Sequence, residues 1–239
     1  MHTQITRDNQ ALLKFWDQAF FIPEEAKEAV RRDGVGTWEE LASSEKLLRA
    51  ACVLGSRKKV LDYGCGNGWA SIAAAKSGCP YVTAADPAPH ATEAADFFAG
   101  LFGVTEQVHP ICGGSEWLKA VPAGTYDGLI CSNVLDVIPP ETAEELIREM
   151  ARVVTVDAEI VMGLNYYLSP ETAAEKGVAL SDGCLLYQDD VLRLVSRTDE
   201  EWVALFAPFF TVESLDHFAW PGENEEKRRV FRLRKRQTA

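Results

Sequence analysis

The sequence has no apolar run that approaches the roughly 18 residues of a membrane-spanning helix, and no basic segment followed by an apolar stretch near its start. We therefore expect a cytoplasmic protein with no membrane span. Basic residues are also scarce: 24 lysines and arginines face 36 aspartates and glutamates, a formal net charge of −12. A field of this sign repels phosphate backbones and anionic lipid, so neither nucleic acid nor membrane is an expected partner.

Motifs of two common classes of site are missing as well. The six cysteines form no CxxC pair and no spacing typical of a metal site, which predicts reduced, buried thiols and no bound metal. No GxxxxGK[ST] segment is present, so nothing supports ATP hydrolysis. What remains is an ordinary globular composition, with 47% hydrophobic residues in a chain of 239, enough for one core and a small appendage.

Helical patterns fill the N-terminal part of the chain. Apolar side chains at helical spacing predict a helix over residues 5–22, and Pro23 both ends it and suits the first turn of a second helix. Residues 37–40 have the spacing of a capping box, which predicts a third helix that runs to about Leu54. We interpret residues 1–56 as a helical cap.

Strand and helix patterns alternate in the following segment. The expected strands are residues 59–63, 81–86, 107–112, 126–132 and 158–165. Alternation of this kind predicts an α/β fold with a doubly wound, mostly parallel sheet and helices on both faces. Ligands of such folds bind outside the carboxyl ends of the strands.

The alternation stops after the fifth strand. We interpret residues 166–207 as an insertion over the ligand crevice, with a hairpin around residues 188–190 and a helix opened by a capping box at residues 198–201. Two final strands, at residues 209–217 and 228–234, are expected to pair as an antiparallel hairpin. They complete a main domain that begins at residue 57.

The last of these strands is strongly basic. Residues 227–236 hold 7 of the 24 lysines and arginines, against the acidic balance of the rest of the chain. Apolar residues alternate with the charges, which favours a charged strand at the edge of the sheet over a nucleic-acid surface.

The strongest functional signal is a glycine-rich turn after the first strand, Val60-Leu61-Asp62-Tyr63-Gly64-Cys65-Gly66-Asn67-Gly68-Trp69. Alternating glycines let the backbone turn tightly and let a flat ligand approach. The dinucleotide fingerprint GxGxxG would need its last glycine where this chain has Trp69, so a nicotinamide or flavin cofactor is disfavoured. A turn without any ligand is the remaining alternative.

Asp86 ends the second strand, about 20 residues past the glycines. A carboxylate at this position can accept two hydrogen bonds from a ribose diol. Taken alone, Asp86 could equally be a turn former or a helix cap. Together with the glycine turn it predicts a nucleoside site.

Residues 57–165 resemble the core of the class I S-adenosylmethionine-dependent methyltransferases, and the run SNVLDVIP is similar to their small-molecule, type 11-like branch. The resemblance implies a seven-stranded sheet of order 3-2-1-4-5-7-6 with its last strand antiparallel. It also implies S-adenosylmethionine as methyl donor, S-adenosylhomocysteine as product and a small-molecule acceptor. The cofactor contacts that it implies are Asp62, Tyr63, Gly64, Cys65, Gly66, Gly68, Asp86, Pro87, Ser115, Glu116, Trp117, Ser132, Asn133 and Val134.

Two departures from that family's pattern affect these expectations. Gly114 stands where an acidic residue is common, so Ser115 or Glu116 would replace the contact, unless the segment simply starts a helix. Many relatives also read NVLHH or NVLEH after the fourth strand, where this chain has Asn133-Val134-Leu135-Asp136-Val137 and no histidine. Asp136 would deprotonate a nucleophile or bind a cationic amine, with a solvated carboxylate at a helix start as the alternative.

Base catalysis is weakly provided for. Only four histidines are present, and an imidazole base would require His2 or His217 to fold over the crevice. Methyl transfer mainly needs alignment, and holding the reactants in a near-attack geometry supplies about 7–11 kcal/mol of the barrier. A nitrogen or thiol nucleophile therefore needs no strong base.

Aromatic residues supply a candidate lid. Tyr166 directly follows the fifth strand and is the aromatic residue that we expect to act at the reacting centre. The other candidates for a lid that stacks on the substrate or the sulfonium methyl group are Phe15, Trp16, Phe20, Trp38 and Tyr167. Simple packing is the alternative for such a set.

These observations lead to the hypothesis of a small-molecule methyltransferase, with two alternatives. One is a non-catalytic subunit that binds S-adenosylmethionine and docks a partner through the apolar helix at residues 11–20. The other is a nicotinamide-dependent oxidoreductase, which Trp69 disfavours.

Overall fold

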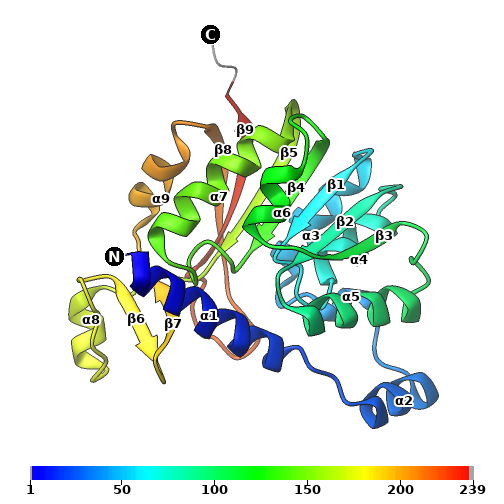
Figure 1. Ribbon diagram of the computed structural model, residues 1–239, viewed down its shortest axis with the longest axis horizontal. Helices are drawn as coiled ribbons and strands as arrows, with labels where there is room; N and C mark the ends of the chain where they lie inside the picture. The colour runs from blue at the N-terminus through cyan, green and yellow to red at the C-terminus, as the bar shows by residue number, and fades with distance from the viewer. Residues whose placement is uncertain (1, 237–239) are drawn as a thin grey trace.

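Seven strands form one mixed sheet in the computed structural model, which describes residues 2–236 and the side chains of 4–236 (Figure 1). The order is β3-β2-β1-β4-β5-β9-β8, and a separate hairpin contributes β6 and β7. With those two strands left out of the count, the order is the predicted 3-2-1-4-5-7-6. The last strand runs antiparallel to both of its neighbours, so the predicted fold class is confirmed.

The strands of the large sheet are β1 (Val60–Tyr63), β2 (Val82–Asp86), β3 (Val108–Cys112), β4 (Tyr126–Ser132), β5 (Val154–Leu164), β8 (Phe210–Phe218) and β9 (Arg228–Lys235). Both β1 and β2 are buried at every position, as expected for parallel strands that are covered on two faces. Strand β5 begins four residues earlier than the sequence indicated, because Val154 already pairs with Tyr126.

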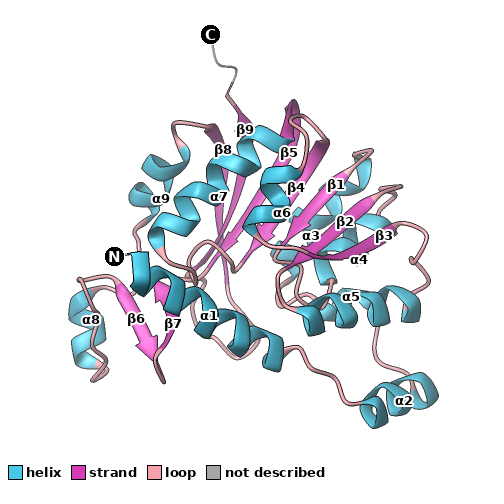
Figure 2. Cartoon of the chain, in the orientation of Figure 1, coloured by secondary structure: helices cyan, strands magenta, loops and turns pink. Residues whose placement is uncertain are grey.

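Helices cover both faces of the sheet (Figure 2). One face carries α3 (Glu45–Cys52), α4 (Trp69–Lys76) and α5 (Pro89–Leu101), and the other carries α6 (Ser115–Ala120), α7 (Pro140–Val153) and α9 (Asp199–Phe206). Successive residues of β1 point to opposite faces: Val60 packs in the core with α3 and α4, and Leu61 packs in the core with α6 and α7. The predicted capping box of α9 is present, with the Glu201 N–H donating to Thr198 Oγ1 at 3.2 Å.

The N-terminal segment differs from the prediction in one helix. Helices α1 (His2–Ala19) and α2 (Glu24–Asp33) flank Pro23 as expected. The third predicted helix is instead split into a 3-10 turn, η1 (Trp38–Leu41), then α3, then a second 3-10 turn, η2 (Val53–Ser56). Two features explain the split. Within residues 2–236, the Thr37 side chain accepts no capping hydrogen bond from a backbone N–H, and Ala42 and Ser44 have extended backbone angles that interrupt a helix.

The segment between β5 and β8 contains α8 (Pro170–Glu175) and the predicted hairpin of β6 (Leu185–Gln188) and β7 (Val191–Val195). In Figure 1 this hairpin lies beside α1. Leu12 of α1 shares a buried apolar cluster with Leu192 and Val195 of β7. The insertion therefore packs against the first helix.

The prediction of a basic edge strand is wrong. β9 lies between β5 and β8, so the edges of the large sheet are β3 and β8. Its first two arginines are buried, and each has a carboxylate partner: Arg228 pairs with Glu223 at 2.6 Å and Arg229 pairs with Asp199 at 2.6 Å. These ion pairs let a basic strand occupy an interior position. None of the helices within residues 2–236 is both long and apolar enough to span a bilayer.

Candidate functional site

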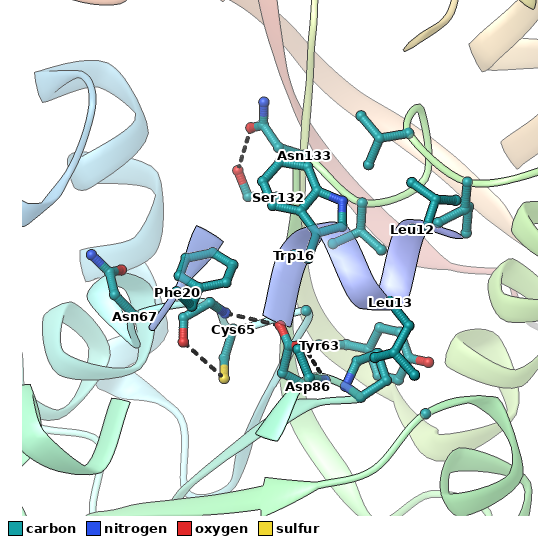
Figure 3. A pocket seen from close by; sticks show the side chains of 18 of the residues that line it. Leu12, Leu13, Trp16, Phe20, Tyr63, Cys65, Asn67, Asp86, Ser132 and Asn133 are labelled. Carbon is teal, nitrogen blue, oxygen red and sulfur yellow. Dashed lines mark hydrogen bonds between the residues drawn. The ribbon is translucent and has the colours of Figure 1, made fainter. Parts of the chain in front are cut away.

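A cavity of about 500 Å³ lies at the carboxyl ends of β1, β2 and β4, a size within the range of about 300–1,000 Å³ typical of small-molecule sites. One side, which we call the strand-end wall, consists of lining residues 63–67, 86–88, 114–115 and 132–134, each group following a strand. The opposite side, which we call the helical wall, consists of lining residues 9–20 from the α1 segment and 137–146 from the α7 segment (Figure 3).

The glycine turn of the strand-end wall needs glycine for two reasons. Gly64 and Gly66 have φ of +73° and +52°, a region that other residues rarely adopt. A Cβ at Gly64 would also lie 2.2 Å from the Val134 side chain, and one at Gly66 would lie 2.7 Å from the Phe20 ring. The turn thus brings bare backbone against both walls of the cavity.

Asp86 fixes this turn to the end of β2. Its carboxylate accepts the N–H of Gly66 at 3.1 Å and the N–H of Ala88 at 2.9 Å (Figure 3). The side chain is only 7% exposed, and burial raises its pKa above the usual range, against the lowering effect of the two N–H groups. Each carboxylate oxygen has a further lone pair for a ligand in the cavity.

Asp62 lies behind the turn instead of lining the cavity. Its carboxylate accepts the N–H of Ser71 at 3.0 Å and the Ser71 hydroxyl at 2.7 Å, in the first turns of α4. Burial raises the pKa of Asp62 to about 7, and the charge of Asp86 adds to that rise. Two mutually repelling carboxyl groups therefore lie beside the glycine turn, a field that favours a positively charged ligand.

The end of β4 is held by a chain of hydrogen bonds. Ser132 Oγ donates to Asn133 Oδ1 at 3.0 Å, and Asn133 Nδ2 donates to Asn165 Oδ1 at 3.0 Å. Asn165 Oδ1 also accepts from Arg228, whose guanidinium lies 3.3 Å from the ring centre of Trp220. Asn133 has φ of +58°, and this network holds it in that strained conformation at the cavity.

Neither candidate catalytic residue lines the cavity. Asp136 is 1% exposed, and its carboxylate accepts the N–H of Asn165, which joins the β4 end to β5. Burial raises the pKa of Asp136 to about 6. The sequence placed the Asp136 side chain either in the crevice or in solvent. Both predictions are wrong, because the loop after β4 turns this side chain into the protein interior. The Tyr166 ring packs with the insertion and lies 5.5 Å from the Arg228 guanidinium.

Of the predicted cofactor contacts, ten line the cavity: Tyr63, Gly64, Cys65, Gly66, Asp86, Pro87, Ser115, Ser132, Asn133 and Val134. Besides Asp62, the structure leaves three outside it. Gly68 caps α4 against Ala95, Glu116 is exposed and pairs with Lys119 at 2.7 Å, and Trp117 packs against the core. Only the first residue of α6 reaches the cavity, because the helix turns its next side chains away.

The first helix supplies the part of the site that the sequence showed least clearly. Trp16 and Phe20 project into the cavity as expected of lid residues, and Leu12 and Leu13 join them (Figure 3). Phe15 instead lies 4.1 Å from the Arg193 guanidinium. The other residues that we missed include Asn9, Thr142 and Leu146. Helical spacing could have identified Asn9, because it lies seven residues before Trp16 and thus on the same face of α1. The same spacing could not identify the α7 residues, because their pattern is that of a helix that packs on the sheet.

Two further lid candidates lie elsewhere. Trp38 packs against the core beside α4, and Tyr167 is an exposed residue. Among the described residues, none of 166–207 lines the cavity, so the insertion does not cover the crevice directly. It supports α1 from behind, where the Tyr187 hydroxyl donates to Asp8 at 3.1 Å.

Polar contacts hold α1 in place over the site. The Asp17 carboxylate accepts the His90 N–H at 2.9 Å, at the start of α5, and lies 3.1 Å from the His90 ring. His217 pairs with Asp199 at 3.1 Å, and the side chain of His2 lies outside the described residues. No histidine side chain that the structure describes lines the cavity. Within the described chain, no group of three or more His, Cys, Asp or Glu residues is placed to hold a metal ion.

Residues 60–157 match the family model described as a methyltransferase domain, and the sheet order is the one that the sequence resemblance implied. This segment is therefore a methyltransferase domain, and it lies in a sheet with the fold of the class I S-adenosylmethionine-dependent methyltransferases. The matched segment contains the glycine turn, Asp86 and the end of β4, and thus the residues of the strand-end wall. No curated protein gives a significant match to the chain.

Solved structures share the fold at low sequence identity. A 1,6-didemethyltoxoflavin-N1-methyltransferase from Burkholderia thailandensis, solved with its substrate and S-adenosylhomocysteine, has a TM-score of 0.62 and 19% identity over 91% of this chain and 92% of its own. The N-methyltransferase NodS from Bradyrhizobium japonicum, solved with S-adenosylhomocysteine, has a TM-score of 0.58 and 17% identity over 80% and 85%. A Listeria monocytogenes protein described as a putative S-adenosylmethionine-dependent methyltransferase has a TM-score of 0.62 and 15% identity over 80% and 97%.

Proposed function

We propose that this methyltransferase binds S-adenosylmethionine against the strand-end wall and transfers its methyl group to a small molecule held against the helical wall. The carrying observation is electrostatic. Within residues 4–236, Asp86 is the only charged residue that lines the cavity, and Asp62 lies directly behind the turn. A sulfonium nucleoside brings positive charge to this field. The diphosphate of a nicotinamide dinucleotide would meet carboxylates without a compensating lysine or arginine, which disfavours the oxidoreductase alternative.

The residues of the strand-end wall fit an adenosyl group. Asp86 has free lone pairs for the ribose hydroxyls, and the small residues Ala88 and Gly114 also line the cavity, where we place the adenine ring. The backbone of Gly64 and Gly66, together with Asn133, would border the methionine part. When bound, S-adenosylmethionine supplies a methyl group on a positively charged sulfur, and neutral S-adenosylhomocysteine is a good leaving group.

The contribution that we assign to the protein is alignment and exclusion of water. Trp16 and Phe20 close the cavity opposite the glycine turn, so an acceptor beside them would be held at short range in a desolvated site. We assign Asp136 a positioning role: it bonds the backbone of Asn165, whose side chain holds Asn133 in the wall. Tyr166 supports the same region through Arg228.

Two observations support a small acceptor over a partner subunit. Leu12, Trp16 and Phe20 of α1 face the cavity or β7, and Leu13 is the one large apolar side chain of residues 11–20 that is exposed, so a docking role for this segment has little exposed apolar surface to use. The structurally similar protein from Burkholderia thailandensis is described as a 1,6-didemethyltoxoflavin-N1-methyltransferase, and 92% of its chain is covered.

Thermal unfolding with four ligands tests the proposal. A ligand at 100 times its dissociation constant adds about 2.7 kcal/mol to the free energy of unfolding, or on the order of 5–10 °C in Tm for a chain of this size. We expect this shift with S-adenosylmethionine and S-adenosylhomocysteine and none with NAD or NADP. A shift with the dinucleotides alone would contradict the proposal. Transfer of labelled methyl groups from S-adenosylmethionine to compounds in a small-molecule extract would distinguish an enzyme from a non-catalytic binding subunit.

A further inference from the structure

The helical wall carries no charge. In the part of the chain whose side chains are described, its polar groups are confined to Asn9 and Thr142, and its other lining residues are Leu12, Leu13, Trp16, Phe20, Val137, Ile138 and Leu146. Asn9 Nδ2 lies 3.4 Å from Thr142 Oγ1, a long contact for a hydrogen bond. This pair joins α1 to α7 and is the polar spot of an otherwise apolar surface.

Charged residues near this wall are engaged elsewhere. Asp8 accepts from the Tyr187 hydroxyl at 3.1 Å and from Gln4 at 2.8 Å, on the side of α1 that faces the hairpin. Asp17 is bonded to the start of α5, and the Arg193 guanidinium lies over Phe15. An ionic group of a ligand would therefore enter this half of the cavity without a partner ion.

From this surface we infer the substrate class: an uncharged, largely apolar molecule that binds between α1 and α7, with one polar group at Asn9 and Thr142. The inference rests on the proposed function. An unpaired charge is costly to bury in an apolar site. The net charge of −12 further disfavours anions, and the sulfonium of bound S-adenosylmethionine disfavours cations. In the complex with S-adenosylhomocysteine, which carries no sulfonium, the cost of burying an unpaired charge against this apolar wall still applies to a cation.

The same surface restricts the acceptor atom. We place the ribose hydroxyls on Asp86, and no other carboxylate and no histidine of the described residues lines the cavity, so the acceptor must bring a lone pair that needs no protein base. An aromatic ring nitrogen meets this requirement. Its lone pair forms the bond to the methyl carbon as the bond from that carbon to sulfur breaks. The positive charge passes from sulfur to nitrogen, neutral S-adenosylhomocysteine leaves, and no proton has to be removed.

A matched series of three probes tests the inference by calorimetric binding to the protein saturated with S-adenosylhomocysteine. The probes share a ring nitrogen and a flat apolar body: neutral 4-phenylpyridine, anionic 4-(pyridin-4-yl)benzoate and cationic 4-(4-aminomethylphenyl)pyridine. We expect the neutral probe to bind at least about 10-fold more tightly than either charged probe, since each tenfold step corresponds to about 1.4 kcal/mol.

A charge added to the wall should reverse the preference. Leu13 lines the cavity and is 41% exposed, so Leu13→Lys is compatible with folding. We expect this variant to bind the benzoate probe about 10-fold more tightly than the parent does. Gln18→Lys places the same charge at an exposed position of the same helix and should leave all three affinities unchanged.

The outcomes separate the inference from the proposed function. Loss of S-adenosylhomocysteine binding in the parent would contradict the proposed function. If that binding is present, a charged probe that binds as tightly as 4-phenylpyridine overturns the inference. Failure of 4-phenylpyridine to bind at millimolar concentration overturns it as well, as does an unchanged benzoate affinity in folded Leu13→Lys.

Discussion

The two walls of the cavity are built in different ways. The strand-end wall presents backbone, and its key side chain, Asp86, is tied to two N–H groups at the ends of buried strands. The helical wall presents side chains of α1 and α7, which are joined by the long Asn9 to Thr142 contact and anchored at Asp17. A wall of backbone changes little when the sequence changes, whereas a wall of side chains can be rebuilt for another ligand.

This contrast predicts separate effects for substitutions on the two sides. Changes in the strand-end wall should weaken the binding of S-adenosylhomocysteine. Changes in the helical wall should alter the second ligand and leave the nucleoside affinity nearly unchanged.

Asp86→Ala should have the largest effect. It removes the carboxylate that we place on the ribose and also releases Gly66. Hydrogen bonds to a charged group contribute about 1.5–3 kcal/mol each, so we expect the affinity for S-adenosylhomocysteine to fall more than about 100-fold by calorimetry. Asp96→Ala removes the same charge from an exposed site on α5 and should keep the parent affinity. Equal affinities of Asp86→Ala and the parent would refute our placement of the ribose.

Gly66→Ala should come next. The added methyl group meets a positive φ and the Phe20 ring, so we expect a loss of about 10-fold or more in nucleoside affinity. Gly103→Ala is the matched control: Gly103 also has positive φ, at +68°, but a Cβ there meets no atom of the described chain within 4 Å. Both variants should lose about 1–2 kcal/mol of stability, because alanine is disfavoured in the left-handed conformation. Only the first should bind the nucleoside less well, and similar affinities for both variants would exclude a close approach at Gly66.

Asp136→Asn should show a smaller effect that depends on pH. Burial raises the folded-state pKa of Asp136 to about 6, so its ionisation weakens the fold as the pH rises through that value. The asparagine variant does not ionise. Its Tm relative to the parent should therefore rise between about pH 5 and pH 8, by on the order of 1 kcal/mol or 2–4 °C. Asp96→Asn, at the exposed site, should show no such trend. A Tm difference between Asp136→Asn and the parent that does not change with pH would contradict the buried, ionisable state that we assign to Asp136.

Trp16→Ala tests the helical wall. It removes the largest apolar surface of that wall, and we expect 4-phenylpyridine to bind about 10-fold less tightly to the complex with S-adenosylhomocysteine. Phe15→Ala is the matched control, because Phe15 faces Arg193. Nucleoside affinity should stay within about threefold of the parent in both variants, a difference below 1 kcal/mol. A large loss of nucleoside affinity in Trp16→Ala would show that the helical wall also binds the nucleoside, and would contradict the assignment of one ligand to each wall.

Sequence patterns predicted the strand-end wall well and the helical wall poorly. Short buried strands and a glycine turn have strong local signatures, so Gly64, Gly66 and Asp86 were expected where the structure has them. Asp136 and Tyr166 were misplaced because both lie in loops beyond the ends of β4 and β5, where no periodic pattern shows whether a side chain enters the cavity or the core. The position of β9 was predicted in two ways: the strand order that the resemblance implied places it between β5 and β8, as found, and the charge pattern placed it at the edge. The second prediction failed because the basic residues have their partners, such as Glu159, far away in sequence.

The most direct test of the central claim is a crystal structure of the protein with S-adenosylhomocysteine. We predict that both ribose hydroxyls lie within about 3.2 Å of the Asp86 carboxylate, with the sulfur directed toward Trp16 across the cavity. A ribose placed away from Asp86, or a nucleoside bound outside this cavity, would contradict the account.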